Sequence, residues 1–285
     1  TSIDQIFRNV RAEVLAETDE KQRPFEETQL TGQTFYLNPS NFNDELNEIE
    51  TVVEEEISEK YLSSQSILEE VIKRYPRNTQ ANFLMGRIYN LMEKYDEAIE
   101  HFNAIDSFIE DKSKLNTYIG SSYKMKGENT KAEKYYTSAI ELDPDNMYTL
   151  YYRALNYDDL EEYEKAIEDL LRIIELDKDG SFRKVNGYVY YYLGLNYASL
   201  ENYDKALDYY SEEINLNPDD FYAYRNRAQL YIDKFYDDEK ALTDFNKAIE
   251  LDSTIVENFF DRAYFYSEIG EYNKALLDYN KAIEL

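Results

Sequence analysis

The sequence predicts an all-α protein built from stacked helical hairpins. A segment of 34 residues recurs along most of the chain, and each copy holds two stretches with the apolar periodicity of a helix. The chain has 285 residues but only 8 glycines and 5 prolines, which favours many helices joined by short turns. One hairpin cannot bury its own apolar face, so neighbouring copies are expected to stack into a solenoid.

A small residue within each expected helix marks the repeat. In the second helix it is an alanine, and steps of 34, 34, 40, 35 and 34 residues separate Ala98, Ala132, Ala166, Ala206, Ala241 and Ala275. In the first helix it lies twelve or thirteen residues earlier, at Gly86, Gly120, Ala154, Gly194, Ala228 and Ala263. Small side chains at these positions let the two helix axes approach closely. We therefore expect tight helix packing around them.

The repeat divides residues 45–285 into seven units. They start near residues 45, 79, 113, 147, 187, 221 and 256; the first is degenerate and the last is truncated at Leu285. Six additional residues, 181–186, separate the fourth unit from the fifth, and the sixth holds one additional residue near 235–236. The second helices are expected to begin at Tyr61, Tyr95, Tyr163, Tyr203, Tyr236 and Tyr272. No polar capping helix follows the last unit, so we expect the array to continue past Leu285.

The pattern within a unit resembles a known family. The fifth unit combines aromatic residues, a Leu-Gly pair, an alanine and a proline at fixed positions: Tyr190, Leu193, Gly194, Tyr197, Ala206, Tyr210 and Pro218. These residues and their spacing resemble the tetratricopeptide repeat (TPR) family, and the resemblance covers residues 45–285. It implies a right-handed superhelix in which the first helices line a concave groove that binds an extended or helical peptide.

Carried over from that resemblance, the groove of this chain is rich in tyrosine. The expected partner-binding residues are Phe83, Arg87, Tyr118, Tyr148, Tyr151, Tyr152, Tyr188, Tyr191, Tyr192, Tyr222 and Tyr264. Tyrosine gives a large contact area at a low entropic cost. We expect a protein or peptide partner with apolar or aromatic anchors, and a basic one toward the acidic later units. The competing interpretation is that a tyrosine-rich sequence scatters tyrosines over its surface.

One TPR subclass binds the acidic C-termini of chaperones through a clamp of lysine, asparagine and arginine. At the matching positions of this chain only Arg87 is basic. We therefore do not expect that ligand.

The charge and the composition exclude several classes of function. With 31 Lys and Arg against 59 Asp and Glu, the net charge is −28, which opposes binding to nucleic acid or to anionic lipid. Binding of RNA by stacking on tyrosine is opposed by the same charge. The chain has no cysteine, which excludes disulfides, thiolate metal sites and a cysteine nucleophile. A single histidine, His101, makes a histidine-rich metal site unexpected.

Residues 1–44 do not fit the repeat. Apolar residues from Ile3 to Leu15 have helical periodicity, and residues 30–37 alternate as a short strand would. The segments Phe7–Val14, Gln22–Glu26 and Leu30–Leu37 resemble the C-terminal end of bacterial caspase-like cysteine peptidase domains. That resemblance implies a parent protein with the catalytic domain upstream of Thr1, whereas the alternative is a cap that packs on the solenoid.

We expect this chain to be a non-catalytic scaffold for protein–protein interaction, with no cofactor and no metal. The alternative function is the distal, regulatory or substrate-recruiting part of a caspase-like peptidase. No apolar run is long enough to span a membrane and no signal-peptide pattern is present, so a cytoplasmic location is expected. The sequence leaves the oligomeric state and the identity of the partner open.

Overall fold

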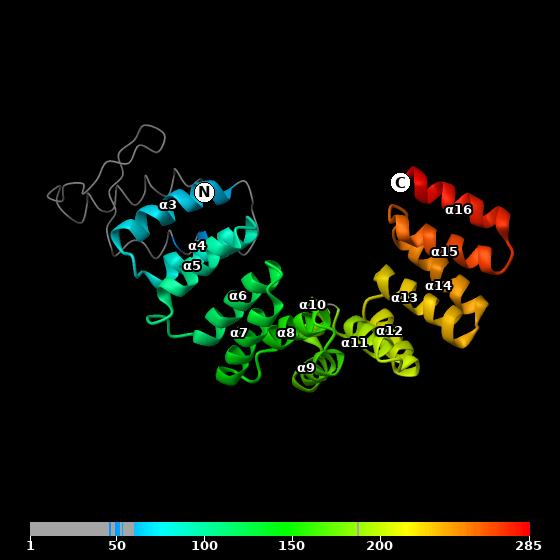
Figure 1. Ribbon diagram of the computed structural model, residues 1–285, viewed down its shortest axis with the longest axis horizontal. Helices are drawn as coiled ribbons and strands as arrows, with labels where there is room; N and C mark the ends of the chain where they lie inside the picture. The colour runs from blue at the N-terminus through cyan, green and yellow to red at the C-terminus, as the bar shows by residue number, and fades with distance from the viewer. Residues whose placement is uncertain (1–45, 47–48, 52, 54–59, 187) are drawn as a thin grey trace. The chain divides into compact units, whose positions relative to one another are not determined.

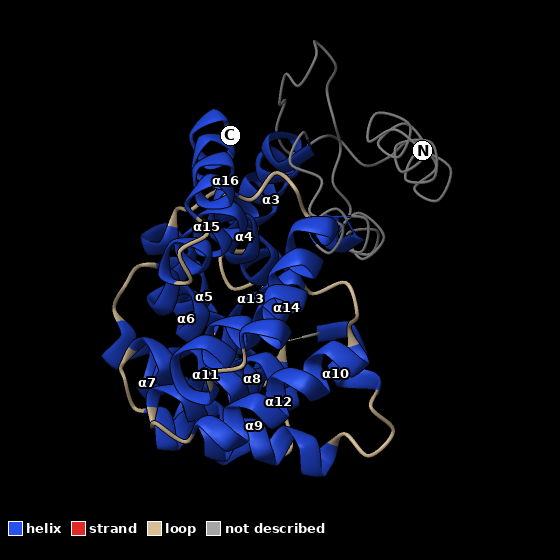
Figure 2. Ribbon diagram, turned by 90° about the vertical axis from the view of Figure 1, so that its right-hand side faces the viewer, coloured by secondary structure: helices blue, strands red, loops and turns tan. Residues whose placement is uncertain are grey.

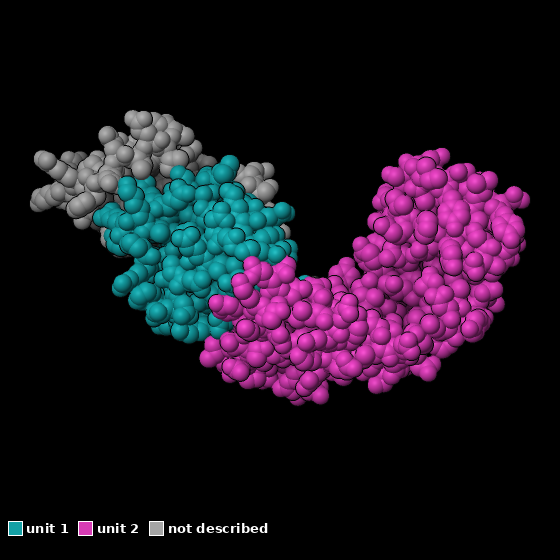
Figure 3. Space-filling view, in the orientation of Figure 1, with its two compact units in different colours: residues 1–126 teal, residues 127–285 magenta. Residues whose placement is uncertain are grey.

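The structure is a computed structural model that describes residues 46, 49–51, 53, 60–186 and 188–285. Within these residues the regular elements are helices, and no strand occurs (Figure 2). The chain divides into two compact units, residues 1–126 and residues 127–285, which are coloured separately in Figure 3. The expected N-terminal helix and strand, and most of the degenerate first repeat, lie outside the described residues.

The first compact unit is built on helices α3 to α6 (Figure 1). Their bounds are α3 Tyr61–Arg74, α4 Thr79–Leu91, α5 Tyr95–Ile105 and α6 Lys112–Met125. Helix α4 packs against α3 and α5, and α5 packs against α6. Buried aliphatic side chains from α3 and α4, among them Leu68, Val71, Leu84 and Ile88, form its core.

The second compact unit continues the same pattern. Its elements are α7 Asn129–Leu142, α8 Met147–Asp159, α9 Tyr163–Leu176, α10 Ser181–Asn186, α11 Val189–Ser199, α12 Tyr203–Leu216, α13 Phe221–Leu230, η2 Tyr231–Phe235, α14 Asp238–Leu251, α15 Val256–Glu268 and α16 Tyr272–Glu284. Helices α8 and α9, α11 and α12, α13 and α14, and α15 and α16 form antiparallel hairpins (Figure 1). Each second helix then packs on the first helix of the next hairpin, as in a stack of repeats.

Short polar side chains define where the first helices begin. The carboxamide or carboxylate oxygens of Asn78, Asp111, Asn146 and Asp220 each accept a hydrogen bond from a backbone N–H in the first turn of the helix that follows. These caps satisfy N–H groups that have no partner inside the helix. In three of these linkers a proline lies two residues before the cap, at Pro76, Pro144 and Pro218, where it cannot extend the preceding helix.

The glycines of the first helices face large aromatic rings on the second helices. A Cβ atom on Gly194 would lie 2.5 Å from Cδ1 of Tyr210, and a Cβ on Gly86 would lie 2.5 Å from Cε1 of Phe102. Both rings are at most 1% exposed. Where the small residue is Ala154, the matching residue of the second helix is the smaller Leu170. In the hairpins of Gly86 and Gly194, the pairing of glycine with an aromatic ring therefore sets the distance between the two helices.

The two helices of a hairpin are joined by a turn with a left-handed residue. Glu93, Glu161, Glu201 and Gly270 hold this position, with φ from 58° to 79°, and Gly127 in the chain between α6 and α7 has φ 82°. Only glycine adopts such angles without a steric cost between Cβ and the carbonyl group. The glutamates at this position therefore keep a conformation that the packed helices on both sides impose.

We expect Gly270→Ala to lower the free energy of unfolding by about 1 kcal/mol, because an L-residue is strained at this φ. No atom lies within 4 Å of the added Cβ, so a clash cannot account for the loss. The reverse change, Glu201→Gly, is expected to leave stability unchanged or to raise it by less than about 1 kcal/mol. Urea denaturation followed by circular dichroism measures both, and equal losses for the two variants would contradict the backbone explanation.

The two insertions of the repeat are accommodated in different ways. Residues 181–186 form a short additional helix, α10, before α11. The one-residue insertion near 235–236 converts the end of α13 into the π-helix η2, in which the wider turn accommodates one more residue. The expectation that Tyr236 begins a second helix is wrong. It lies in the left-handed turn with φ 54°, it is 84% exposed, and α14 begins at Asp238.

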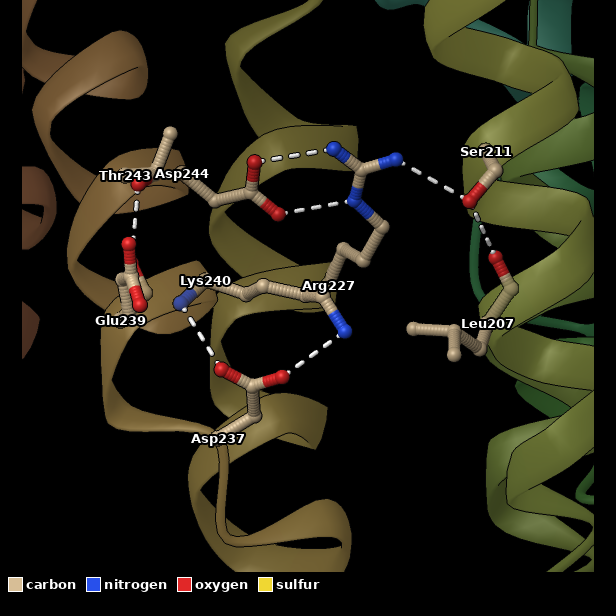
Figure 4. Close-up of polar contacts among 8 residues, drawn as sticks. All are labelled: Leu207, Ser211, Arg227, Asp237, Glu239, Lys240, Thr243 and Asp244. Atoms are coloured by element: carbon tan, nitrogen blue, oxygen red, sulfur yellow. Dashed lines mark hydrogen bonds and ion pairs between the residues drawn. The ribbon is translucent and has the colours of Figure 1, made fainter.

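Each of three hairpins in the second compact unit contains an equivalent buried ion pair between an arginine and an aspartate. The guanidinium groups of Arg153, Arg227 and Arg262 each bind both carboxylate oxygens of Asp169, Asp244 and Asp278, respectively, at 2.7–2.9 Å. A third donor of each arginine reaches a polar side chain of the preceding second helix, which is Ser211 for Arg227 at 3.0 Å (Figure 4). Each arginine therefore links three helices, and the bidentate geometry fixes how they are aligned.

Candidate functional site

The expected groove residues of the first compact unit lie close together. The Phe83 ring centroid is 5.0 Å from that of Tyr118, and the Arg87 guanidinium is 5.4 Å from the centre of the Tyr118 ring. Phe83 is only 7% exposed, because it also packs against Phe102. Its ring therefore contributes to the core of this unit, whereas Arg87 and Tyr118 remain partly accessible.

In the second compact unit, seven of the expected residues form a contiguous group. We call it the tyrosine cluster, and it comprises Tyr148, Tyr151, Tyr152, Tyr188, Tyr191, Tyr192 and Tyr222. Its members come from the first helices α8, α11 and α13 and from the turn before α11. Tyr151 contacts Tyr192 across two hairpins, with ring centroids 6.1 Å apart. Tyr191 contacts Tyr222 at the same distance and so links the next pair of hairpins.

The cluster has a supporting layer and an accessible layer. Tyr151, Tyr191 and Tyr192 are partly buried, and the angle between ring planes is 76° for Tyr151 and Tyr192 and 77° for Tyr191 and Tyr192. The other four rings are exposed: Tyr148 by 52%, Tyr152 by 38%, Tyr188 by 45% and Tyr222 by 39%. Edge-to-face packing of this kind holds the rings in defined positions. The accessible rings are therefore preorganised.

The sequence did not single out Phe182, which also belongs to this site. It lies on the inserted helix α10, is 5% exposed, and contacts the ring of Tyr148 at 5.0 Å. The Asp177 carboxylate holds α10 in place, because it accepts hydrogen bonds from the backbone N–H groups of Phe182 and Arg183 and pairs with the Arg183 guanidinium at 3.0 Å. The sequence feature that could have indicated Phe182 is its position in the inserted residues 181–186, shortly before the tyrosine-rich first helix of the fifth repeat.

Tyr264 lies apart from the tyrosine cluster. It is on α15, is 46% exposed, and makes no ring contact with a cluster member. Phe260, one turn earlier on the same helix, is 53% exposed and packs against Tyr279 at 5.6 Å. These two side chains form a smaller aromatic patch on α15.

Burial favours the protonated form of the three partly buried tyrosines of the cluster. Burial raises the pKa of Tyr151, and burial raises the pKa of Tyr191 to about 12. The Tyr192 pKa is raised by burial and then by the carboxylates of Asp158 and Asp159. Each hydroxyl can therefore donate a hydrogen bond at any physiological pH. The Tyr191 hydroxyl already accepts one from the amide of Asn226 at 3.1 Å.

A buried carboxylate lies beneath the cluster. Glu213 on α12 is fully buried and accepts a hydrogen bond from the backbone N–H of Tyr191 at 3.2 Å. It also accepts one from the side-chain amide of Asn217. Burial raises the pKa of Glu213 to about 7, from an ordinary value of 4.5. Its carboxylate thus satisfies an N-terminal N–H of α11 at a substantial cost in desolvation.

The raised pKa of Glu213 predicts a pH effect. Between about pH 4.5 and about pH 7 the folded protein keeps a proton that the unfolded chain has lost. The contribution of Glu213 to stability therefore decreases as the pH rises through this window. We expect the melting temperature of Glu213→Gln, measured relative to that of the original protein, to increase as the pH rises. Circular dichroism melts at about pH 4.5, 6 and 8 measure the difference, and a difference that is independent of pH would contradict the raised pKa.

The described residues contain no group of three or more His, Asp or Glu side chains arranged to hold a metal ion. Within the same residues, no helix combines the length and the apolar character needed to cross a bilayer.

Comparison with protein families matches the repeated hairpins. Models of the tetratricopeptide repeat match residues 58–111, 115–146, 149–179, 187–220 and 256–285, which together make up more than half of the chain. The chain belongs to the tetratricopeptide repeat family. None of these TPR matches covers residues 221–255, although α13 and α14 form a hairpin there. This is the hairpin whose repeat the π-helix interrupts.

Solved TPR structures have the same fold. A tetratricopeptide repeat protein from Parabacteroides merdae is 21% identical with a TM-score of 0.63, over 84% of this chain and 92% of that one. The C-terminal part of a TPR protein from Cytophaga hutchinsonii is 17% identical with a TM-score of 0.63, over 84% and 95%. The protein MamA is 25% identical with a TM-score of 0.51, over 58% and 93%.

Among curated proteins, none matches the sequence significantly. The resemblance of residues 1–44 to the end of a caspase-like peptidase domain receives no support, since the TPR matches begin at residue 58 and none of the family matches falls before it.

Proposed function

We propose that this chain is a non-catalytic scaffold whose tyrosine cluster binds a peptide or a protein partner. The observation that carries the proposal is the run of exposed tyrosines on α8, in the turn before α11 and on α13, supported from below by partly buried rings. Monomeric proteins rarely leave contiguous aromatic surface exposed without a partner. Tyrosine is also among the residues that contribute most of the energy at protein interfaces.

The geometry suits an extended or helical segment of the partner. The accessible rings lie on α8, in the turn before α11 and on α13, so a partner crossing them contacts several rings in turn. Because the rings are held by their neighbours, little side-chain entropy is lost on binding. The acidic surroundings favour a basic partner with apolar or aromatic anchors. Arg87, Tyr118 and Tyr264 are proposed as additional contacts outside the cluster.

Selection from a random library of twelve-residue peptides tests this function. The variant Tyr148→Ala/Tyr188→Ala removes two exposed rings and is expected to lower the affinity for the selected peptides by about tenfold or more. The matched control is Tyr236→Ala/Tyr272→Ala, which removes two rings that are 84% and 71% exposed outside the cluster. Circular dichroism verifies that each variant is folded. If both variants bind the selected peptides equally well, the cluster is not the binding surface.

A further inference from the structure

The protein covers many of its tyrosine rings with its own lysines. In four hairpins the tyrosine near the end of the first helix lies under a lysine of the second helix, eight or nine residues later. The Nζ atom lies 5.0 Å from the ring centre in Tyr157–Lys165, 4.6 Å in Tyr197–Lys205, 5.2 Å in Tyr231–Lys240 and 5.4 Å in Tyr266–Lys274. An ammonium group over a ring face is attracted by the π-electrons of the ring.

The tyrosine cluster differs from this rule. Among the described residues, no lysine or arginine lies over the rings of Tyr148, Tyr151, Tyr188, Tyr191 or Tyr192. The guanidinium of Arg225 lies 5.6 Å from the ring centre of Tyr222, at the edge of the cluster. Its guanidinium is also paired with the carboxylate of Asp261 at 3.5 Å. Among the described residues, the faces of these five rings therefore carry no cation of the chain itself, although Arg225 also acts on the hydroxyl of Tyr191.

Carboxylates lie near three of these rings. Asp158 and Asp159 act on the hydroxyl of Tyr192, and Asp220 acts on the hydroxyls of Tyr188 and Tyr191. Asp220 itself is 8% exposed and caps α13 by accepting a hydrogen bond from the N–H of Tyr222. A positive charge placed among these rings is attracted by the carboxylates and by the ring faces together.

We propose that the tyrosine cluster is a binding subsite for a cationic side chain, arginine or lysine, of the partner. The proposal rests on the function proposed above and names the chemical group that the cluster recognises. The aliphatic stem of such a side chain packs on an exposed tyrosine ring of the cluster, while its charged end lies near a carboxylate. The incoming cation takes the place that Lys165, Lys205 and their equivalents occupy on the other tyrosines.

The inserted helix α10 contributes a wall to this subsite. Phe182 packs at 72° against the ring of Tyr148 and is itself anchored by the Asp177–Arg183 pair. Tyr148 is therefore held at the edge of the cluster although half of its surface is exposed. The carboxylates oppose an acidic or phosphorylated ligand at the same place.

The first test uses a capped tetra-arginine peptide and the tetra-citrulline peptide, which has nearly the same shape but no charge. We expect the arginine peptide to bind and to shift the ring resonances of Tyr148 and Tyr188 in NMR spectra of the full chain. The citrulline peptide is expected to bind at least about tenfold more weakly. If the two peptides bind equally, charge is not recognised and the inference is wrong.

The second test separates the rings from the general negative charge of the protein. Tyr148→Leu/Tyr188→Leu leaves every charge in place and is expected to lower the affinity for the arginine peptide by about fivefold or more. Tyr148→Phe/Tyr188→Phe keeps the ring faces, and its affinity is expected to stay within about twofold of that of the original protein. The control Tyr236→Leu/Tyr272→Leu is expected to leave the affinity for the arginine peptide unchanged. Unchanged binding by the first variant would place the cation elsewhere and overturn the inference.

The outcomes for the function and for the subsite can be told apart. Peptides that are selected from the library, depend on Tyr148 and Tyr188, and lose affinity when their arginines become citrulline support both proposals. If such peptides keep their affinity after that replacement, the scaffold function stands and the cationic subsite is wrong. If no selected peptide depends on the cluster, the proposed function fails.

Discussion

Replacement of Arg227 by leucine is expected to lower the free energy of unfolding by about 3–5 kcal/mol. The change removes the partner of Asp244, whose side chain is only 6% exposed, and leaves a buried carboxylate without its two guanidinium hydrogen bonds. It also removes the donor to Ser211 on the preceding hairpin. Urea denaturation measures the loss, and amide hydrogen exchange is expected to localise it to α12, α13 and α14.

The chain contains its own apolar alternative to this ion pair. In the fifth repeat the residues equivalent to Arg227 and Asp244 are Leu193 and Tyr209. Arg227 and Leu193 each precede the small residue of the first helix, and Asp244 and Tyr209 each precede the large residue of the second helix. We therefore expect the double variant Arg227→Leu/Asp244→Tyr to recover most of the stability that Arg227→Leu loses, because no buried charge remains unpaired. If the double variant were as unstable as the single one, the loss would come from packing rather than from the unpaired carboxylate.

Gly194→Ala is expected to lower the free energy of unfolding by about 1–3 kcal/mol. The added methyl group would lie 2.5 Å from two ring carbons of Tyr210, which is 1% exposed and has little room to move. Either the ring leaves its preferred rotamer or α11 moves away from α12. The same urea denaturation experiment measures this loss.

A second substitution tests the cause of that loss. In the fourth repeat Ala154 faces Leu170, so Gly194→Ala/Tyr210→Leu reproduces a pairing that the chain already uses. The double variant is expected to be less destabilised than the sum of the two single variants, because each change relieves the misfit that the other creates. Additive losses would show that the methyl group and the ring do not compete for the same space.

Most of the fold could be predicted from the sequence. The spacing of the small residues and the helical periodicity predicted an all-α stack of TPR hairpins, and the family matches and the solved structures confirm it. These signals are readable because they repeat with a constant period and reflect contacts inside one hairpin. Tyr236 was misassigned because a single inserted residue changed the local helix to a π-helix and broke the period.

The candidate site could be predicted only as a set of positions. The sequence indicated which tyrosines fall on one side of the first helices, but not how deeply each ring is buried. Phe83 proved to be buried against Phe102 and Tyr118, whereas Tyr148 and Tyr188 are about half exposed. Burial of one ring depends on the size of its neighbours on two other helices, and the repeat pattern does not specify those sizes.

The sequence by itself determined the type of element, its approximate length and the faces of the helices that pack, because these depend on residues within about one repeat of each other. Only the tertiary structure decided which side chains of different hairpins meet. It brought Phe182 from an insertion onto Tyr148, Glu213 to the N-terminus of α11, and the charged groups of Arg227 and Asp244 into one buried pair. Such contacts depend on the close packing of several helices at once, where a shift of one ångström changes which atoms touch.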